Sequence, residues 1–454
     1  MLQLILLAVT CGMLYFSRRQ AAFSPLRMFL YGWVIVLGAA VSGLVVYGRG
    51  FAVITFVLVL GTLVAFTIGT SLAPNYPIRD EPFGETRNKI DGYLQVCLCL
   101  LALLGAVMVF QEMRGGGFAL LENFSDASGM RRNAKWDRFN AGEADITPVR
   151  SLGIAACLAV ATLLPFATKE RRRGLQAVAA LSAVVVTADS LLAAGRFFFG
   201  VLVVCLLVST SLVYGGAALR KVFTVRRLVI AIPVAVYFLV IFPVQRSAYL
   251  AASAQRSLRH SGDAEFPDWV TNLSQEPGMG WFEVFAHSTN YFSGALAKLN
   301  YFVTETDVFS WYKLGLYNVP QISQVMGATT DDTTPWHYIR LDIAQVLSNE
   351  RWSLNPWSTG IRDLGIDFGL LTIPAIVVLG YIAQSVYNKS VAGRSYIGLI
   401  AATYVSVACL IFAFISPFQI RILSNGFWLL AALAFTHWLL AGKREHAQHP
   451  HPTR

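Results

Sequence analysis

The sequence predicts an all-α protein that crosses a membrane about eleven times and carries one large, partly helical loop. Three observations predict this class. First, 55% of the 454 residues are hydrophobic, the mean hydropathy is +0.55, and only 14% of the residues are charged, against about 25% in soluble domains. Second, several apolar runs reach about 18 residues, the length at which a helix crosses about 30 Å of hydrocarbon. Third, basic residues recur in alternate connections between these runs.

Each expected membrane-spanning segment is an apolar run bounded by charged or turn-forming residues. In chain order the segments are 2–16, 28–46, 51–70, 93–111, 151–168, 176–194, 197–218, 228–244, 366–386, 395–416 and 424–441. They divide the chain into a first bundle (1–244, with an outer loop at 111–150), a large loop domain (245–365), a second bundle (366–441) and a tail (442–454). The first run does not resemble a signal peptide, because no charge precedes it and Arg18 and Arg19 follow it.

The basic residues predict the orientation. With eleven spans, one side of the membrane receives Arg18, Arg19, Arg27, Lys169, Arg171, Arg172, Arg173, Arg220, Lys221, Arg226, Arg227, Lys389, Arg394, Lys443 and Arg444. This side is expected to be cytoplasmic, which places the N-terminus and the large loop outside and the C-terminus inside. The net charge of +10 then reflects topology and predicts no nucleic-acid partner. A bacterial inner membrane fits this pattern, and the six cysteines, all inside expected spans, predict neither disulfides nor a zinc site.

The large loop is too rich in aromatic residues to be a flexible linker. Six of the ten tryptophans lie there: Trp269, Trp281, Trp311, Trp336, Trp352 and Trp357. Apolar periodicity predicts short surface helices within Trp281–Phe302 and Leu341–Val346, and the stretch Pro267–Gly280 is expected to form turns. Aromatic faces can stack on sugar rings, although membrane anchoring or core packing is the simpler explanation for any single tryptophan.

Five arginines from separate parts of the chain fall at the outer ends of expected spans. They are Arg196, Arg246, Arg340, Arg362 and Arg421. A guanidinium binds phosphate oxygens in a planar, charge-assisted way, so two or three of them together could hold a lipid diphosphate. Each alone could equally extend to lipid phosphates as an anchor. Arg362 and Asp363 could also form a local ion pair, and Asp363 and Asp367 suit the start of a helix.

Several catalytic classes lack their motifs. The chain has no Walker loop, no HExxH, no pair of CxxC motifs and no G-x-S-x-G elbow. The outer histidines His260, His287 and His337 are spread along the loop and make a weak case for a metal site. We therefore expect no metal and no cofactor.

The order of features in 175–442 resembles the oligosaccharide repeat unit polymerases (O-antigen or Wzy-type polymerases) of bacterial surface polysaccharides. A hairpin of spans surrounds Gly195-Arg196, and Arg246 follows the next span. A large loop containing "NYFSGALAKLNYF" comes next and ends in "NPWSTGIRDLGIDFGLLTIPAIVVLG", with Asp-Phe-Gly entering a span. The chain departs from some members in one respect, because the arginine and glycine that those members carry eleven residues apart in their outer loops occur here only at Arg131 and Gly142.

This resemblance implies a metal-independent glycosyltransferase with a GT-C-like fold. Its donor would be a polyprenyl (undecaprenyl) diphosphate-linked oligosaccharide in the lipid bilayer, and a co-polymerase that regulates chain length would be a possible partner. The five arginines would bind the diphosphate. The acceptor hydroxyl needs a general base, for which His337, Asp342 and Asp363 are candidates, although an adjacent arginine makes Asp363 a poor base.

Two alternatives stay open. An O-antigen ligase would use the same donor and the same arginine chemistry but transfer a finished glycan to a lipid A core. A flippase or other transporter of lipid-linked oligosaccharides would form no bond, and we would expect it to carry polar groups deep within its spans.

Overall fold

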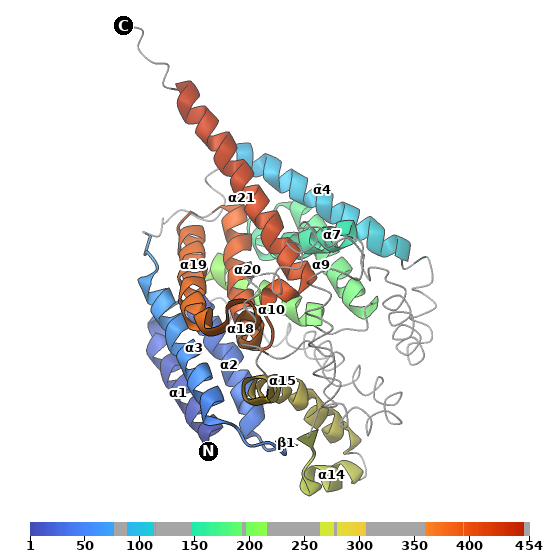
Figure 1. Ribbon diagram of the computed structural model, residues 1–454. Coiled ribbons are helices and arrows are strands. Elements are labelled where there is room, and N and C mark those ends of the chain that lie inside the picture. The colour runs from blue at the N-terminus through green and yellow to red at the C-terminus, as the bar shows by residue number, and fades with distance from the viewer. Residues whose placement is uncertain are drawn as a thin grey trace, which may run out of the picture.

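The computed structural model describes residues 1–76, 89–112, 114, 148–192, 197–215, 264–276, 279–305, 359–393 and 395–448. Within these ranges the protein is mostly helical (Figure 1). The helices are α1 (Leu2–Phe16), η1 (Ser17–Arg19), α2 (Pro25–Val41), α3 (Val53–Leu72), α4 (Lys89–Glu112), α7 (Pro148–Ala161), α8 (Leu164–Lys169), α9 (Arg173–Leu192), α10 (Phe197–Tyr214), α14 (Asp268–Gln275), α15 (Gly280–Glu305), α18 (Gly360–Phe368), η5 (Gly369–Leu371), α19 (Thr372–Gly393), α20 (Tyr396–Phe412), η6 (Pro417–Gln419) and α21 (Arg421–Gln448). Two short strands, β1 (Val46–Tyr47) and β2 (Ala264–Glu265), pair antiparallel.

Three of the described helical stretches are long and apolar enough to cross a membrane: Val53–Leu72, Gly92–Gln111 and Gly360–Gly393. Five further apolar helices in the described ranges have 10–17 residues: Pro25–Val41, Val149–Ala161, Phe198–Tyr214, Tyr396–Phe412 and Ile422–His437. The expected segment 228–244 lies outside the described residues. The helical class and the membrane character predicted from the sequence are therefore present, and three helices meet the length and hydropathy requirement.

Hydrogen bonds define two ends of the bundle. At one end β1 pairs with β2, with Val46 opposite Glu265, and α15 lies across the ends of α2 and α3 (Figure 1). At the other end the Asn388 side chain, late in α19, donates a 2.9 Å hydrogen bond to the carbonyl of Pro74, just beyond α3. We call these the loop end and the basic end, because Arg18, Arg27 and Lys389 belong to the second. The N-terminus lies at the loop end, and α21 extends past the basic end (Figure 1).

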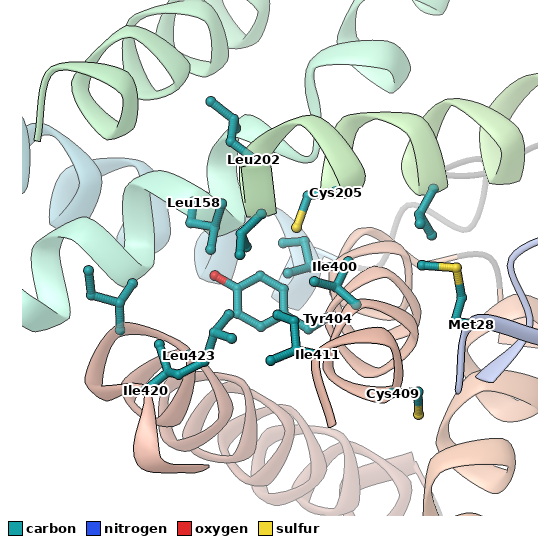
Figure 2. Packing of buried hydrophobic residues seen from close by; sticks show 14 of the residues in the cluster. Met28, Leu158, Leu202, Cys205, Ile400, Tyr404, Cys409, Ile411, Ile420 and Leu423 are labelled. Atoms are coloured by element: carbon teal, nitrogen blue, oxygen red, sulfur yellow. The ribbon is translucent and has the colours of Figure 1, made fainter. Parts of the chain in front are cut away.

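A continuous apolar core joins α7, α10, α20 and α21. Tyr404 of α20 is 1% exposed and lies at its centre, with Leu158, Cys205 and Leu423 around the ring (Figure 2). Its hydroxyl donates a 3.0 Å hydrogen bond to the carbonyl of Ala155, which satisfies the one polar atom that this ring brings into the core. The core therefore fixes α20, and with it the chain segment that leads to the loop end.

Close backbone contact joins α3 to α19. A Cβ atom placed on Gly69 would lie 2.1 Å from the carbonyl oxygen of Val377, and one on Gly380 would lie 2.7 Å from the carbonyl oxygen of Phe66. Small residues permit such approach between helices in a membrane. The pair therefore sets the spacing of two of the three membrane-length stretches.

We expect Gly69→Ala to destabilise the protein by about 1–3 kcal/mol, because the added methyl group forces the two backbones apart. The thermal unfolding of the purified protein in detergent measures this effect. Gly12→Ala in α1 is the matched control, because no heavy atom of the described residues lies within 4 Å of the Cβ position there. Equal unfolding midpoints for the two variants would show that the α3–α19 contact is not tight.

Three predicted elements differ from the structure. The stretch Pro267–Gly280 does not form only turns: Asp268–Gln275 is the helix α14, because Val270 is buried in a small core with Leu44 and Ala286. The short helices expected in Trp281–Phe302 are one 26-residue helix, α15. The expected span 151–168 is divided into α7 and α8, since Pro165 near the start of α8 suits a first helical turn.

Candidate functional site at the loop end of the bundle

Two sets of hydrogen bonds hold α15 on the connection between α2 and α3. The Tyr47 hydroxyl donates to the side-chain oxygen of Asn290 at 2.7 Å and lies 2.9 Å from the hydroxyl oxygen of Ser293. Further along α15, the Asn300 side chain accepts hydrogen bonds from the Ala52 amide and the Thr55 hydroxyl at 2.9 and 2.8 Å. These bonds anchor a helix of the large loop directly to the membrane bundle.

The short helix α18 forms the entrance to the α19 span and is itself buried. Every residue from Gly360 to Asp367 is buried. Thr359 caps its N-terminus, with φ of 72° and its side chain accepting a hydrogen bond from the Arg362 amide. A β-branched residue in the left-handed region is unfavourable, so its surroundings must hold it there. Gly369, with φ of 53°, ends the helix, and its left-handed conformation allows the chain to turn into α19.

Arg362 and Asp363 form a buried ion pair. The Arg362 Nε and Nη2 atoms both donate to Oδ1 of Asp363, at 3.0 and 2.5 Å, and the two side chains are 1% and 0% exposed. The other carboxylate oxygen, Oδ2, accepts a 2.8 Å hydrogen bond from the Ser416 amide. The guanidinium also lies 5.1 Å from the ring centroid of Phe302 on α15. Both carboxylate oxygens are thus occupied, which is the arrangement that makes a buried charge tolerable.

Two more charged residues are buried at the same place. Lys298 of α15 is 4% exposed and Asp367 of α18 is 0% exposed. Burial, and secondly the positive charge of Arg362, lower the pKa of Lys298 to about 7. We call Lys298, Arg362, Asp363 and Asp367 the polar cluster. It lies where α15, α18 and residues 413–420, the turn segment between α20 and α21, meet.

The low pKa of Lys298 predicts a pH-dependent stability. Below pH 7 the amine is protonated in both the folded and unfolded states, so the cost of burying its charge is present in full. Between pH 7 and the ordinary lysine pKa of 10.5, the unfolded state binds more protons than the folded state, and stability rises with pH. We expect the temperature of the unfolding midpoint in detergent to increase as the pH is raised from about 7 to 9.

Lys298→Met is the variant that checks this assignment. Arg362, whose positive charge acts on Lys298, is retained in this variant, as are Asp363 and Asp367 of the same helix, so a loss of the rise can be attributed to the amine. A wild-type midpoint that does not rise above pH 7, or an unchanged rise in Lys298→Met, would contradict the assignment.

A second, partly buried ion pair lies at the loop end. Arg150, near the start of α7, donates to Asp189 of α9 at 2.6 Å, and the Asn425 side chain of α21 donates to the Ser151 hydroxyl. Asp189 lies within the expected span 176–194, and its charge is paired there with that of Arg150. These contacts place the start of α7 and the last turns of α9 beside the first turns of α21.

Only some of the predicted site residues lie within the described ranges of the structure. Arg362 and Asp363 are adjacent and paired, and α21 begins at Arg421, directly after the turn segment. The predicted residues that lie outside the described residues are Arg196, Arg246, Arg340, His337 and Asp342. Sequence reasoning did not select Lys298 as a site residue, although it is the one charged residue of "NYFSGALAKLNYF", and it expected Asp367 only to complement a helix dipole.

Within the described ranges, no group of three or more histidine, cysteine, aspartate and glutamate residues is arranged to hold a metal ion. Comparison with known proteins gives no match: no family model fits the chain, and no curated protein or solved structure is significantly similar to it.

Proposed function

We propose that the protein is a glycosyltransferase that polymerises polyprenyl diphosphate-linked oligosaccharide repeat units. The observation that carries the proposal is the polar cluster, because it gathers two basic and two acidic side chains at the loop end of a bundle that contains membrane-length helices. Burying such groups is costly unless they are paired or used. The proposal includes about eleven spans, a GT-C-like arrangement and a bacterial inner membrane with the loop end and N-terminus on the periplasmic side.

The proposed reaction joins two lipid-linked glycans. An oxygen of the acceptor hydroxyl attacks the anomeric carbon of the donor sugar, the bond from that carbon to the diphosphate breaks, and the hydroxyl proton passes to a base. The electron pair of the broken bond leaves with the diphosphate. Arg196, Arg246, Arg340 and Arg421 stabilise this developing negative charge, since preorganised donors act most strongly where charge develops. The growing glycan thereby moves from its polyprenyl carrier to the next repeat unit.

Asp363 is the least suitable of the three candidate bases. Its Oδ1 accepts two hydrogen bonds from Arg362 and its Oδ2 accepts one from the Ser416 amide. Since both oxygens are held by donors of the protein and the side chain is 0% exposed, an acceptor hydroxyl has no access to this carboxylate. The proposal therefore assigns proton removal to His337 or Asp342.

The position of the charged groups also bears on the alternatives. A flippase would need polar groups along a path through the membrane, whereas the polar cluster and the Arg150–Asp189 pair both lie at one end of the bundle. A ligase would share the donor chemistry and differ in the acceptor. The identity of the acceptor is thus what distinguishes a polymerase from a ligase.

The test uses purified protein in lipid nanodiscs with one defined undecaprenyl diphosphate-linked repeat unit. A polymerase is expected to convert it into a ladder of products that differ by one repeat unit, with release of undecaprenyl diphosphate. A ligase would give a product only when a lipid A core acceptor is added, and a flippase would give no new glycosidic bond. Failure to form any product longer than one repeat, with the repeat unit of the source organism, would contradict the proposal.

A further inference from the structure

The helix α18 holds the turn segment at two points. The Thr359 amide donates a 2.9 Å hydrogen bond to the carbonyl of Phe414, and the Ser416 amide donates a 2.8 Å hydrogen bond to Oδ2 of Asp363. In the first bond the start of α18 donates to the turn segment, and in the second the turn segment donates to α18. Together they join one turn of α18 to three consecutive residues of the turn segment. They therefore fix both the position and the rotation of residues 414–416 relative to α18.

Side-chain packing reinforces the same contact. A Cβ atom on Gly360 would lie 2.6 Å from the ring of Phe412, so only glycine permits this approach. The Phe414 ring meets Phe292 of α15 edge to face, with 5.3 Å between centroids. The turn segment is thus held between α18 and α15.

The charges of the pair are balanced within the protein. Arg362 is 1% exposed and directs two nitrogen atoms to Asp363, and its guanidinium carbon lies over the Phe302 ring. To reach a diphosphate, the guanidinium would have to leave a fully buried carboxylate without its partner, which is costly. The pair is therefore built to bind within the protein.

We infer that Arg362 and Asp363 form a charge-balanced positioning pair that holds the turn segment, and through it Arg421, at the loop end, without contacting the substrate themselves. Arg421 follows Ser416 by five residues, and η6 (Pro417–Gln419) fills the interval. This inference rests on the proposed function for the role of Arg421. It gives Arg362 and Asp363 a different role from the diphosphate ligand and general base expected from the sequence.

The first experiment compares single and double substitutions in the nanodisc polymerisation assay. Asp363→Asn keeps an oxygen that can accept from the Ser416 amide but leaves Arg362 buried without a counter-charge, so kcat should fall by more than about tenfold. Adding Arg362→Met removes that charge and keeps an unbranched side chain over Phe302. A positioning pair predicts that R362M/D363N recovers to within about threefold of wild type, because a buried pair can be replaced by uncharged groups without loss. A double variant as inactive as D363N, or a D363N enzyme with wild-type kcat, would overturn the inference.

The second experiment tests the hydrogen bond from the Ser416 amide to Asp363 while both charged side chains are retained. Ser416 has φ of −60°, which proline can adopt, so Ser416→Pro removes the donated hydrogen while the backbone conformation at this position is retained. We expect its loss of kcat to match that of D363N. Ser416→Ala keeps the amide and is the matched control, since the buried Ser416 hydroxyl has no hydrogen-bond partner among the described residues. Wild-type kcat in Ser416→Pro would also overturn the inference.

A third measurement does not depend on activity. Arg421→Cys is alkylated with a maleimide, and the modification at position 421 is quantified by peptide mass spectrometry. Adding D363N to Arg421→Cys should change the alkylation rate by at least about threefold. Adding R362M/D363N instead should restore the rate of Arg421→Cys alone. If wild type makes no polymer, the proposed function fails, and this measurement still decides whether the pair positions residue 421. An unchanged rate in all three backgrounds would refute the positioning role alone.

Discussion

Replacing Arg421 by alanine is expected to slow polymer formation by roughly tenfold to a hundredfold, because each charge-assisted bond to the diphosphate contributes about 1.5–3 kcal/mol. Arg196→Ala, Arg246→Ala and Arg340→Ala should have effects of the same order at those positions that face the donor, and we expect at least two of the four to do so. Arg421→Lys should rescue only in part, since an ammonium group cannot form a bidentate pair with phosphate oxygens. The measurement is the initial rate of ladder formation from a defined lipid-linked repeat unit, with protein amounts matched.

Arg18 supplies the control for these substitutions. It lies at the basic end, where it is exposed and stacks over Tyr15 with 4.5 Å between its guanidinium carbon and the ring centroid. Arg18→Ala removes an arginine at the opposite end of the bundle and should leave the rate unchanged. If all four alanine variants polymerise at the rate of Arg18→Ala, the four arginines are membrane anchors and the proposed diphosphate site is wrong.

A cysteine at position 274 is expected to react with a membrane-impermeant maleimide in whole cells whose outer membrane has been made permeable. Ser274 lies in α14, at the loop end, and its exposed hydroxyl donates a 2.8 Å hydrogen bond to the nearby carbonyl of Thr271, so replacing it by cysteine is a conservative change. The proposed orientation places this helix on the periplasmic side, outside the barrier formed by the inner membrane. Labelling should therefore be nearly complete before the cells are lysed.

A cysteine at position 71 is the control on the other side of the membrane and should not be labelled before lysis. Ser71 is exposed near the end of α3, at the basic end, and should react only after lysis. The unmodified chain gives the background from its native cysteines, of which Cys11 and Cys97 are exposed. Labelling of position 71 in intact cells with protection of position 274 would invert the orientation and exclude a periplasmic reaction at the loop end.

The sequence predicts the positions of the helices more accurately than it predicts the contacts of the site residues. The apolar runs at 2–16, 51–70 and 395–416 correspond closely to α1, α3 and α20, because helix formation in lipid depends on the local run of apolar residues. The adjacent charges of Arg362 and Asp363 were recognised as an ion pair or helix start, and the structure shows both. Lys298 was missed, because a single lysine in a partly apolar helix has no pattern of its own.

Composition and the placement of charges determined that this chain is helical, contains membrane-length segments and concentrates unusual charge where the α19 span begins. These properties follow from the transfer free energy of each segment, which depends on its own residues. Only the tertiary structure decided that α14 is a helix, that the chain turns at Gly369, and that Asp363 bonds the amide of Ser416. Those features depend on contacts between distant residues, such as Val270 with Leu44 and Asp363 with Ser416. No local pattern reports such contacts, because the energy that stabilises them appears only when the separate elements pack together.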